Sequence, residues 1–579
     1  MNLFAPFNSD GYKLAHAEMY SDGTTLVNAN NTPRNDRIYR RQATKYYDGK
    51  IVVIGQEGAL QEVVENWQKF FDMDKGIAIA RFKMLCDNYL GMDAVPTHRL
   101  AALHDLGYLP LKIKTVDEGT KMGFNIPVMT IENTVPHAFW LVNFLETTLS
   151  NLMWKPSTVA TIACEYKRML LDYAEQTGVD LNTVLFQGHS FACRGMSGPE
   201  DSARSEFGHI AAFLGTDSLG SIMYAQDYYR AGEFVAASVP ATEHAVATSN
   251  ILRIERALTE GDYFFVNDEQ QKIYSEMWVE GEDQRLIAEM MFLYELMLKF
   301  PKGILSYVAD SYDFWGVLSR GLPYMKDVIL RRESNGITPG RLVLRPDTGV
   351  PERVVNGYFV YPEGYNDLYN MANAEESAVV KQGEKFYRYE VEYEGFGGEG
   401  WPERYVLGEE VSAEEVLGAA RLLQDIFGYT ETEKGYRQYI DQIGLIYGDS
   451  ITPQRCLDIL EGLKQNGLAS SCCVFGIGSY TYQCLTRDVF GFTVKATYTE
   501  VNGEKISIFK DPKTDSKKKS AKGLLAVVQD KETGELVLLN DVTREFEESE
   551  ENLLHIRFLD GNFANLSTLG QIRHKLERG

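Results

Sequence analysis

The strongest constraint on the fold of this chain is a rhythm that begins near residue 181. A short apolar run rich in β-forming residues ends abruptly in polar or glycine residues, and a helical pattern follows. Strands that are apolar on both faces and alternate with helices favour a parallel sheet covered by helices. The five instances are VLF before Gln187-Gly188-His189, ILSYVA before Asp310, RLVL before Arg345, LIY before Gly448 and CCVF before Gly476.

We therefore predict an α/β fold in which residues 181–479 form an incomplete TIM-like barrel, with an open doubly wound sheet as the alternative. In such barrels the polar residues at the carboxyl ends of the strands gather at one mouth, where the chemistry takes place. One helix is well marked, with Thr452 as its N-cap and Pro453 as its first residue.

The two chain ends and one internal segment lack this rhythm. Residues 1–180 read as mixed α and β, and we expect residues 480–579 to pack with them as a second, β-rich domain. Residues 353–440 look inserted, because alternating tyrosines from Tyr387, the loop GFGGEGW and a second strand form a hairpin signature. Ser412 and Glu415 make a capping box, which predicts one helix after the hairpin.

Charge and cysteine usage exclude several function classes. Lys+Arg 58 against Asp+Glu 82 gives a net charge of −24, which repels nucleic acid over long range. No uncharged stretch approaches the roughly 20 residues that cross a bilayer, so no membrane association is expected. The seven cysteines contain no C-x-x-C pair and read as reduced thiols, and we expect a cytoplasmic protein.

Three segments at strand ends carry candidate chemistry. In LRPDTG, 344–349, Arg345 can fork onto phosphate oxygens while Asp347 accepts hydrogen bonds from ribose hydroxyls, although an Arg–Asp pair can also serve only to fix the loop. Gly448-Asp449 and Gly476-Ile477-Gly478-Ser479 are turns at which the backbone can approach a phosphate, and glycine turns often have a purely conformational role. His244 follows Glu243, and histidines more often have no catalytic task.

Ten segments in order resemble the nicotinamide phosphoribosyltransferase family, the type II phosphoribosyltransferases. The resemblance covers nearly the whole chain except the insertion at 353–440 and a shorter one near 265–285. The segments are DGYKLAH at 10–16, TVATIACEYKRML at 158–170, HSFACRG at 189–195, GTDS at 215–218, SVPATEH at 238–244, ADSYD at 309–313, LRPDTG at 344–349, YGDS at 447–450, LTRD at 485–488 and FKDP at 509–512.

The resemblance implies an enzyme that joins nicotinamide to phosphoribosyl pyrophosphate in NAD biosynthesis. Phe191 would stack on the pyridine ring together with Tyr12, which would arrive from the second subunit of a homodimer whose active sites lie across the interface. Asp217 would accept a hydrogen bond from the carboxamide and repel nicotinate. A nicotinate phosphoribosyltransferase is the nearest alternative, and a binding protein that lost the reaction is another.

The remaining implied roles concern the sugar phosphate. His244, Asp310 and Asp347 would be catalytic, Mg²⁺ would travel mostly on pyrophosphate oxygens with no metal ligand identified in the chain, and ATP would stimulate the reaction by phosphorylating His244. The resemblance further implies Arg194, Arg345 and Pro346 at the pyrophosphate, Asp347, Gly448 and Asp449 at the ribose, Gly478, Ser479 and Arg487 at the 5′-phosphate, assistance from Ser306 and Lys495, and Lys510 and Lys518 as phosphate ligands between subunits.

Two departures from the family pattern bear on these roles. The glycine turn, often G-x-G-G in the family, ends here in Ser479, so a hydroxyl or a backbone N–H would supply the phosphate contact. The insertion begins just after the Asp347 loop and returns just before Gly448, so it could form a lid or reshape the mouth.

Overall fold

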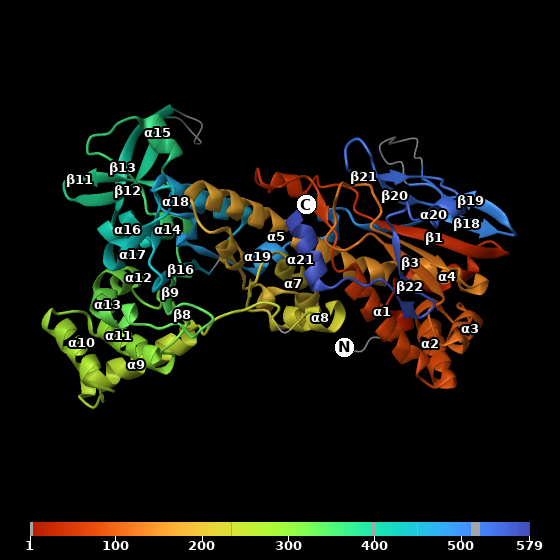
Figure 1. Cartoon of the computed structure of the whole chain (residues 1–579), viewed down its shortest axis with the longest axis horizontal. Coiled ribbons are helices and arrows are strands. Elements are labelled where there is room, and N and C mark those ends of the chain that lie inside the picture. The colour runs from red at the N-terminus through yellow and green to blue at the C-terminus, as the bar shows by residue number, and fades with distance from the viewer. Residues whose placement is uncertain (1–3, 233, 395–400, 449, 511–520, 579) are drawn as a thin grey trace.

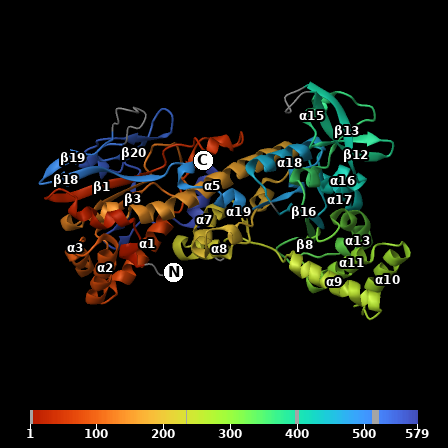
Figure 2. The ribbon, with the colours of Figure 1, turned by 180° about the vertical axis from the view of Figure 1, so that it is seen from behind.

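The computed structural model describes residues 4–578 except 233, 395–400, 449 and 511–520. It is elongated, with a β-rich lobe at one end and a helix-covered parallel sheet at the other (Figure 1). The helix α5 (Glu146–Thr177) runs between them, and Figure 2 shows the same arrangement from behind. No helix in the described part of the chain is long and apolar enough to cross a membrane.

The parallel sheet confirms the predicted incomplete barrel. Every neighbouring pair in it is parallel, as expected for strands that are separated in sequence by helices. In spatial order its strands are β7 (Gly215–Thr216), β6 (Gly188–Ser190), β17 (Val474–Ile477), β16 (Ile443–Tyr447), β9 (Arg341–Arg345) and β8 (Ile304–Val308).

A seventh extended segment joins the two edges of this sheet. Ala237 bridges to Gly215 of β7, and Ala241 bridges to Ser306 of β8, both in the parallel sense. The bonds are few, with Thr216 N–H donating to Ala237 O over 3.1 Å and Thr242 N–H donating to Ser306 O over 3.1 Å. We call residues 237–241 the seam, because they close the ring without forming a regular strand.

Helices surround the ring and leave its carboxyl-end loops accessible. The N-cap predicted for α18 (Pro453–Gln465) is confirmed, since Thr452 Oγ1 accepts from Arg455 N–H over 3.2 Å. The larger helices are α7 (Pro199–Ala212), α8 (Leu219–Tyr229), α9 (His244–Glu260), α10 (Asp268–Val279), α11 (Gln284–Lys299), α13 (Leu322–Leu330) and α18 (Pro453–Gln465).

The main sheet of the β-rich lobe is antiparallel and built from both chain ends, as predicted, and two short antiparallel pairs lie beside it, β2 (Ile51–Val52) with β4 (Lys121–Met122) and β20 (Ala526–Gln529) with β21 (Leu536–Leu539). Helices α1 (Gln56–Phe71), α2 (Lys75–Leu90), α3 (His98–Leu106) and α4 (Trp140–Phe144) lie on one side of it (Figure 1). Its order is β19 (Glu504–Ser507), β18 (Thr493–Val501), β1 (Thr24–Thr32), β5 (Met129–Asn133), β3 (Leu111–Thr115), β22 (His555–Leu559) and β23 (Asn562–Phe563).

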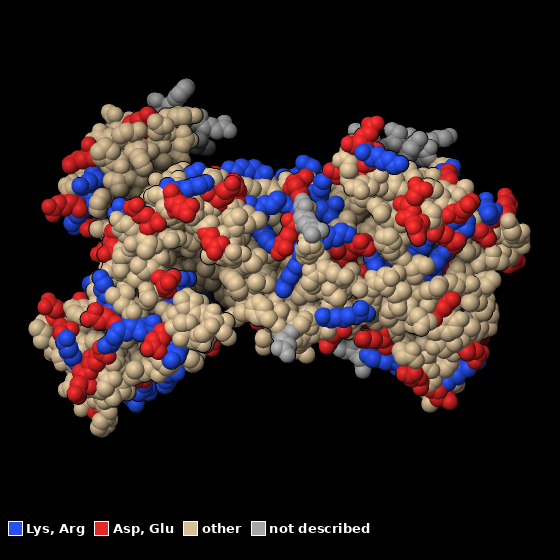
Figure 3. Space-filling view, viewed as in Figure 1, with Lys and Arg blue, Asp and Glu red and all other residues tan. Residues whose placement is uncertain are grey.

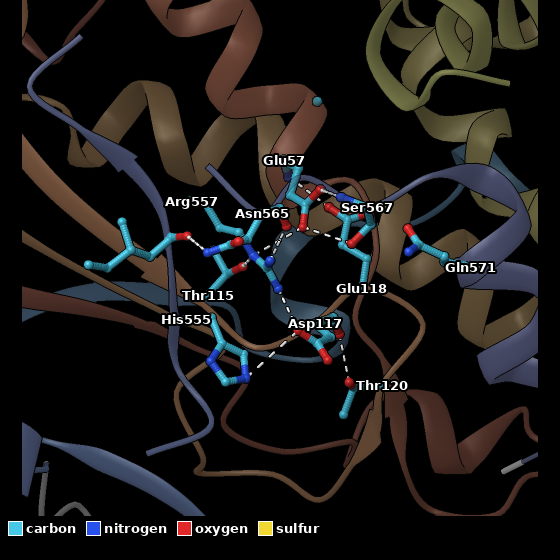
Figure 4. A network of polar contacts seen from close by, with 12 residues as sticks. Glu57, Thr115, Asp117, Glu118, Thr120, His555, Arg557, Asn565, Ser567 and Gln571 are labelled. Carbon is cyan, nitrogen blue, oxygen red and sulfur yellow. Dashed lines mark hydrogen bonds and ion pairs between the residues drawn. The ribbon is translucent and has the colours of Figure 1, made fainter. Parts of the chain in front are cut away.

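A buried polar network fastens the C-terminal segment to this lobe (Figure 4). Arg557 Nε lies 3.1 Å from Glu57 Oε1, and Glu57 also accepts from the backbone N–H and the hydroxyl of Ser567. Glu118 lies beside Glu57 and accepts from the N–H groups of Gly55 and Glu57. Burial, followed by the negative charge of Glu57, raises the pKa of Glu118 to about 8.

The insertion forms a small sheet with its own apolar cluster around Tyr361, Met371 and Tyr389. It contains the predicted hairpin, but the single helix predicted after Ser412 is two helices, because Gly418 adopts φ 78° between them. Its elements are β10 (Phe359–Tyr361), α15 (Leu368–Asn373), β11 (Ala378–Gln382), β12 (Lys385–Glu394), β13 (Trp401–Val411), α16 (Ala413–Leu417) and α17 (Ala419–Phe427).

One predicted strand is wrong. The run VLF lies in the short helix α6 (Val184–Gln187), and the strand of the sheet is the next three residues, Gly188–Ser190. A short apolar run does not distinguish a strand from a buried helical turn, so periodicity could not locate this boundary. Similarly, Gly476 and Ile477 belong to β17 itself, and the turn begins only at Gly478.

Candidate active site

Most of the predicted site residues lie at the carboxyl end of the parallel ring. Because parallel strands end at one edge, loops that are far apart in sequence meet there. Phe191 follows β6, Asp217 follows β7, His244 follows the seam, Asp310 follows β8, Pro346 and Asp347 follow Arg345 of β9, Gly448 follows β16, and Gly478 and Ser479 follow β17.

Asp310 is the centre of one hydrogen-bonded group. Its carboxylate, of which 2% is exposed, lies 2.9 Å from His244 Nε2 and accepts from Asp347 N–H over 2.8 Å and Thr348 Oγ1 over 2.9 Å. Burial by itself raises the pKa of Asp310, but these three groups outweigh it and lower the pKa below the ordinary value. An ionised Asp310 therefore orients His244 at the first residue of α9 and fixes the loop that carries Asp347.

Arg345 is directed into the ring more than toward Asp347. Its Nη2 donates to Thr242 O over 3.1 Å, whereas the distance from Nη2 to Asp347 Oδ2 is 3.9 Å. The buried Nε of Arg345 has no hydrogen-bond partner among the described residues. An Arg–Asp pair that only fixed the loop would be closer, so this geometry favours a guanidinium that is available to an anion.

Gly448 lies against the Asp347 carboxylate. A Cβ at this position would lie 2.2 Å from Asp347 Oδ1 and 3.2 Å from Arg345 Cδ. The Gly448 N–H also points toward Pro346 O at 3.4 Å. The glycine is therefore required here by a close approach of two strand-end loops, and it lets Asp347 lie directly beside the next strand.

Phe191 lies on the backbone of β17. Its N–H donates to Ile477 O over 2.9 Å, and a Cβ at Gly476 would lie 2.7 Å from its ring. The ring is partly exposed, with its centroid 4.9 Å from that of His189. One face of the ring is thus supported by the strand, which leaves a flat apolar surface at the mouth.

Asp217 is held at the mouth by two neighbours, His189 and Ser238. His189 Nε2 lies 2.9 Å from Asp217 Oδ1, and the Ser238 hydroxyl donates to the same oxygen over 2.5 Å. Burial raises the pKa of Asp217, but these hydrogen bonds, the charge of His189 and then that of Arg345 lower it below the ordinary value. Asp217 is therefore an anion that contacts His189, and the His189 ring in turn lies against the ring of Phe191.

The turn of Arg194 packs on the start of α19 (Ser479–Gln483). A Cβ at Gly195 would lie 2.0 Å from Ser479 Oγ, so the turns that follow β6 and β17 are in direct contact. Arg194 is exposed in this turn. Arg194, Gly478 and Ser479 thus form one surface, whereas Ser306 is buried inside β8 and takes part through its backbone pairing with the seam.

Four of the predicted residues lie away from the mouth of the ring, namely Tyr12, Arg487, Lys495 and Lys510. Tyr12, 62% exposed, is in the β-rich lobe, where its ring contacts His16. Lys495 is in β18 of the same lobe, and partial burial followed by the charges of Arg34 and Lys510 lowers its pKa. Arg487 is exposed in a turn before β18. Asp449 and Lys518 lie outside the described residues.

Sequence reasoning missed two residues that contact Asp217, namely His189 and Ser238. Both lie inside segments that match the family, HSFACRG and SVPATEH, so the signal was present. Their pairing with Asp217 spans 28 and 21 positions, and it becomes visible only when β6, β7 and the seam are adjacent.

Comparisons with known proteins identify the family of this chain. A family model described as the nicotinate phosphoribosyltransferase (NAPRTase) family matches residues 186–550. Nicotinamide phosphoribosyltransferase of Acinetobacter baylyi is 39% identical over 575 residues, which cover 99% of this chain and 97% of that protein. The protein of the same name from Mycoplasma pneumoniae is 28% identical and covers 89% of this chain and 93% of its own length.

A solved structure matches in fold. The crystal structure of human nicotinic acid phosphoribosyltransferase superposes with a TM-score of 0.52 at 13% sequence identity, covering 98% of this chain and 93% of that chain. Identity this low supports the architecture alone. With the family model spanning more than half of the sequence and a 39% identical relative matching along nearly its whole length, the chain belongs to the nicotinate phosphoribosyltransferase family.

Proposed function

We propose that this protein is a cytoplasmic nicotinamide phosphoribosyltransferase, which condenses nicotinamide with 5-phosphoribosyl 1-pyrophosphate to nicotinamide mononucleotide and pyrophosphate in NAD salvage. The observation that carries the choice of nicotinamide is Asp217. An ionised carboxylate near the partly exposed Phe191 ring accepts a hydrogen bond from an amide NH₂ and repels a carboxylate. The names of two relatives support the same substrate.

The reaction requires charge neutralisation more than a protein nucleophile. Departure of pyrophosphate from C1 leaves an oxocarbenium-like ribosyl cation, so the leaving group needs cations and the pyridine nitrogen must already be aimed at C1. The pyrophosphate arrives with its Mg²⁺ as the substrate complex. It is bound by the cationic groups Arg345, His244 and Arg194. Asp347, fixed through Asp310 and beside Gly448, accepts hydrogen bonds from the ribose.

A homodimer would complete the site. Tyr12, Lys495 and Lys510 lie in the β-rich lobe, and Lys495 has Arg34 and Lys510 near it, so this surface can attract phosphates. We infer that the partner chain supplies the second aromatic face and these cations, with Lys518 assigned to the same role. Over the face drawn in Figure 3, Lys and Arg are interspersed with Asp and Glu, so the cationic contribution is local.

ATP is proposed to stimulate the reaction through a phosphohistidine at His244. The support is its place at the first residue of α9, because a helix N-terminus stabilises a phosphate, and its contact with Asp310 orients the ring. His244→Ala is expected to abolish stimulation by ATP and to leave slower ATP-independent synthesis. Stimulation that survives the substitution would contradict this role.

One assay tests the main proposal. Purified protein is mixed with phosphoribosyl pyrophosphate, Mg²⁺ and either nicotinamide or nicotinate, and the mononucleotide products are separated and quantified. We expect nicotinamide to be used in strong preference, and Asp217→Asn to relax that preference. Equal or better use of nicotinate would indicate a nicotinate phosphoribosyltransferase, and no product from either would indicate a binding protein.

A further inference from the structure

The two oxygens of the Asp217 carboxylate have different environments. Oδ1 is contacted by both His189 Nε2, at 2.9 Å, and Ser238 Oγ, at 2.5 Å. Among the described residues Oδ2 has no hydrogen-bond partner, and 44% of the side chain is exposed. Since an ionised carboxylate only accepts, both neighbours must donate, and Oδ2 is the oxygen left for a ligand.

The two donors reach Asp217 from opposite sides of β7. His189 is in β6, where its backbone pairs with Gly215, while Ser238 is in the seam on the other side of β7. The imidazole is closely held, because a Cβ at Gly215 would lie 2.8 Å from His189 Nδ1, and 12% of the side chain is exposed. The carboxylate is thus held between two separate backbone elements, which restricts its rotation.

We propose that His189 and Ser238 are positioning residues that set the preference of the pyridine site for an amide over a carboxylic acid. The proposal rests on the proposed function and deepens it. Two carboxylates that face each other tend to share a proton, so a protonated Asp217 could donate to nicotinate and bind it. Donors on Oδ1 stabilise the ionised form, which opposes that proton uptake and keeps Oδ2 an acceptor.

The electrostatics of the site agree with this assignment. Burial, the largest effect, raises the pKa of Asp217, but the hydrogen bonds from His189 and Ser238, together with the charges of His189 and Arg345, lower it below the ordinary value. Arg345 adds a smaller effect of the same sign from β9. The other nearby histidine, His209, is occupied elsewhere, because its ring nitrogens lie 2.8 Å from Tyr482 Oη and 2.9 Å from Gly215 O.

The test compares three variants and one control by the ratio of kcat/KM for nicotinamide to kcat/KM for nicotinate. His189→Leu and Ser238→Ala each remove a donor to a charged group, which is expected to lower the ratio about 10- to 100-fold. His189→Gln keeps an N–H₂ group at a similar reach, so it should restore most of the ratio. His574→Leu, at an exposed histidine of α21 (Leu569–Arg578), is the matched control and should leave the ratio unchanged.

The outcomes separate this inference from the proposed function. If the wild type uses nicotinamide but His189→Leu keeps the full ratio, the positioning role is wrong. If the wild type makes no nicotinamide mononucleotide, the proposed function fails, and crystal structures of the variants then decide the inference. The Asp217 carboxylate should reorient in His189→Leu and keep its orientation in His189→Gln, and an unmoved carboxylate in both would overturn the proposal.

Discussion

Replacing Gly448 with alanine should disable the site without disturbing the fold. The backbone of Gly448 lies outside the left-handed region, so alanine introduces no strain in the main chain. Its methyl group would lie 2.2 Å from Asp347 Oδ1, whereas ordinary contact begins at 3.4 Å. The carboxylate must therefore move by about 1 Å, and a misplacement of that size costs on the order of 100-fold in rate.

Initial rates of mononucleotide formation over a range of phosphoribosyl pyrophosphate concentrations measure this loss. We expect kcat/KM to fall by roughly 100-fold, equivalent to about 2.7 kcal/mol of transition-state stabilisation, with an unchanged thermal midpoint. Gly570→Ala is the control, because its Cβ would meet only Thr568 Oγ1 at 3.9 Å in a helix far from the mouth in sequence. A kcat/KM within about threefold of wild type would refute the proposal that Asp347, in its position beside Gly448, binds the ribose.

Three further outcomes concern stability. Because the pKa of Glu118 is raised from 4.5 to about 8 in the folded protein, stability should fall between those pH values by up to about 1.4 kcal/mol per unit, and Glu118→Gln should flatten the pH dependence of the melting temperature. Arg557→Met leaves the buried Glu57 uncompensated and should cost about 3–5 kcal/mol by denaturant titration, whereas a cost below about 1 kcal/mol would contradict the pairing. Thr452→Ala removes the N-cap of α18 and should cost about 1 kcal/mol in the same titration. An unchanged free energy of unfolding would mean that water replaces the Thr452 hydroxyl as the cap.

The sequence predicted the parts of the ring that have strong local signals. Strands β8 and β16 are continuous apolar runs with abrupt polar ends, and burial on both faces produces that pattern. Strand β9 has the same apolar centre, although its residues are alternately buried and half-buried. It did not reveal β7, which has two residues, or the seam, whose few bridges leave no periodic pattern. Closure of the ring is therefore a tertiary event that short-range propensity does not encode.

The site divides in the same way. Arg345, Asp347 and Gly448 stand at recognisable strand ends, so their position at the mouth followed from topology. The donors on Asp217 were not assigned, because the predicted strand VLF begins four residues before β6, the strand that carries His189. The separation of Tyr12 and Lys495 from the mouth depends on how the lobes are joined, which no local pattern records.

The length of α5 has a consequence for how any complete site is assembled. Its 32 residues correspond to a rod of about 48 Å, and its ends pack against different parts of the molecule, from the β-rich sheet to α18. A continuous rod of this kind keeps Lys13, which contacts Glu146 at its start, far from Lys464 of α18, which contacts Gln176 at its end. In the proposed homodimer, in which the lobe of one chain completes the mouth of the other, dilution should therefore weaken activity.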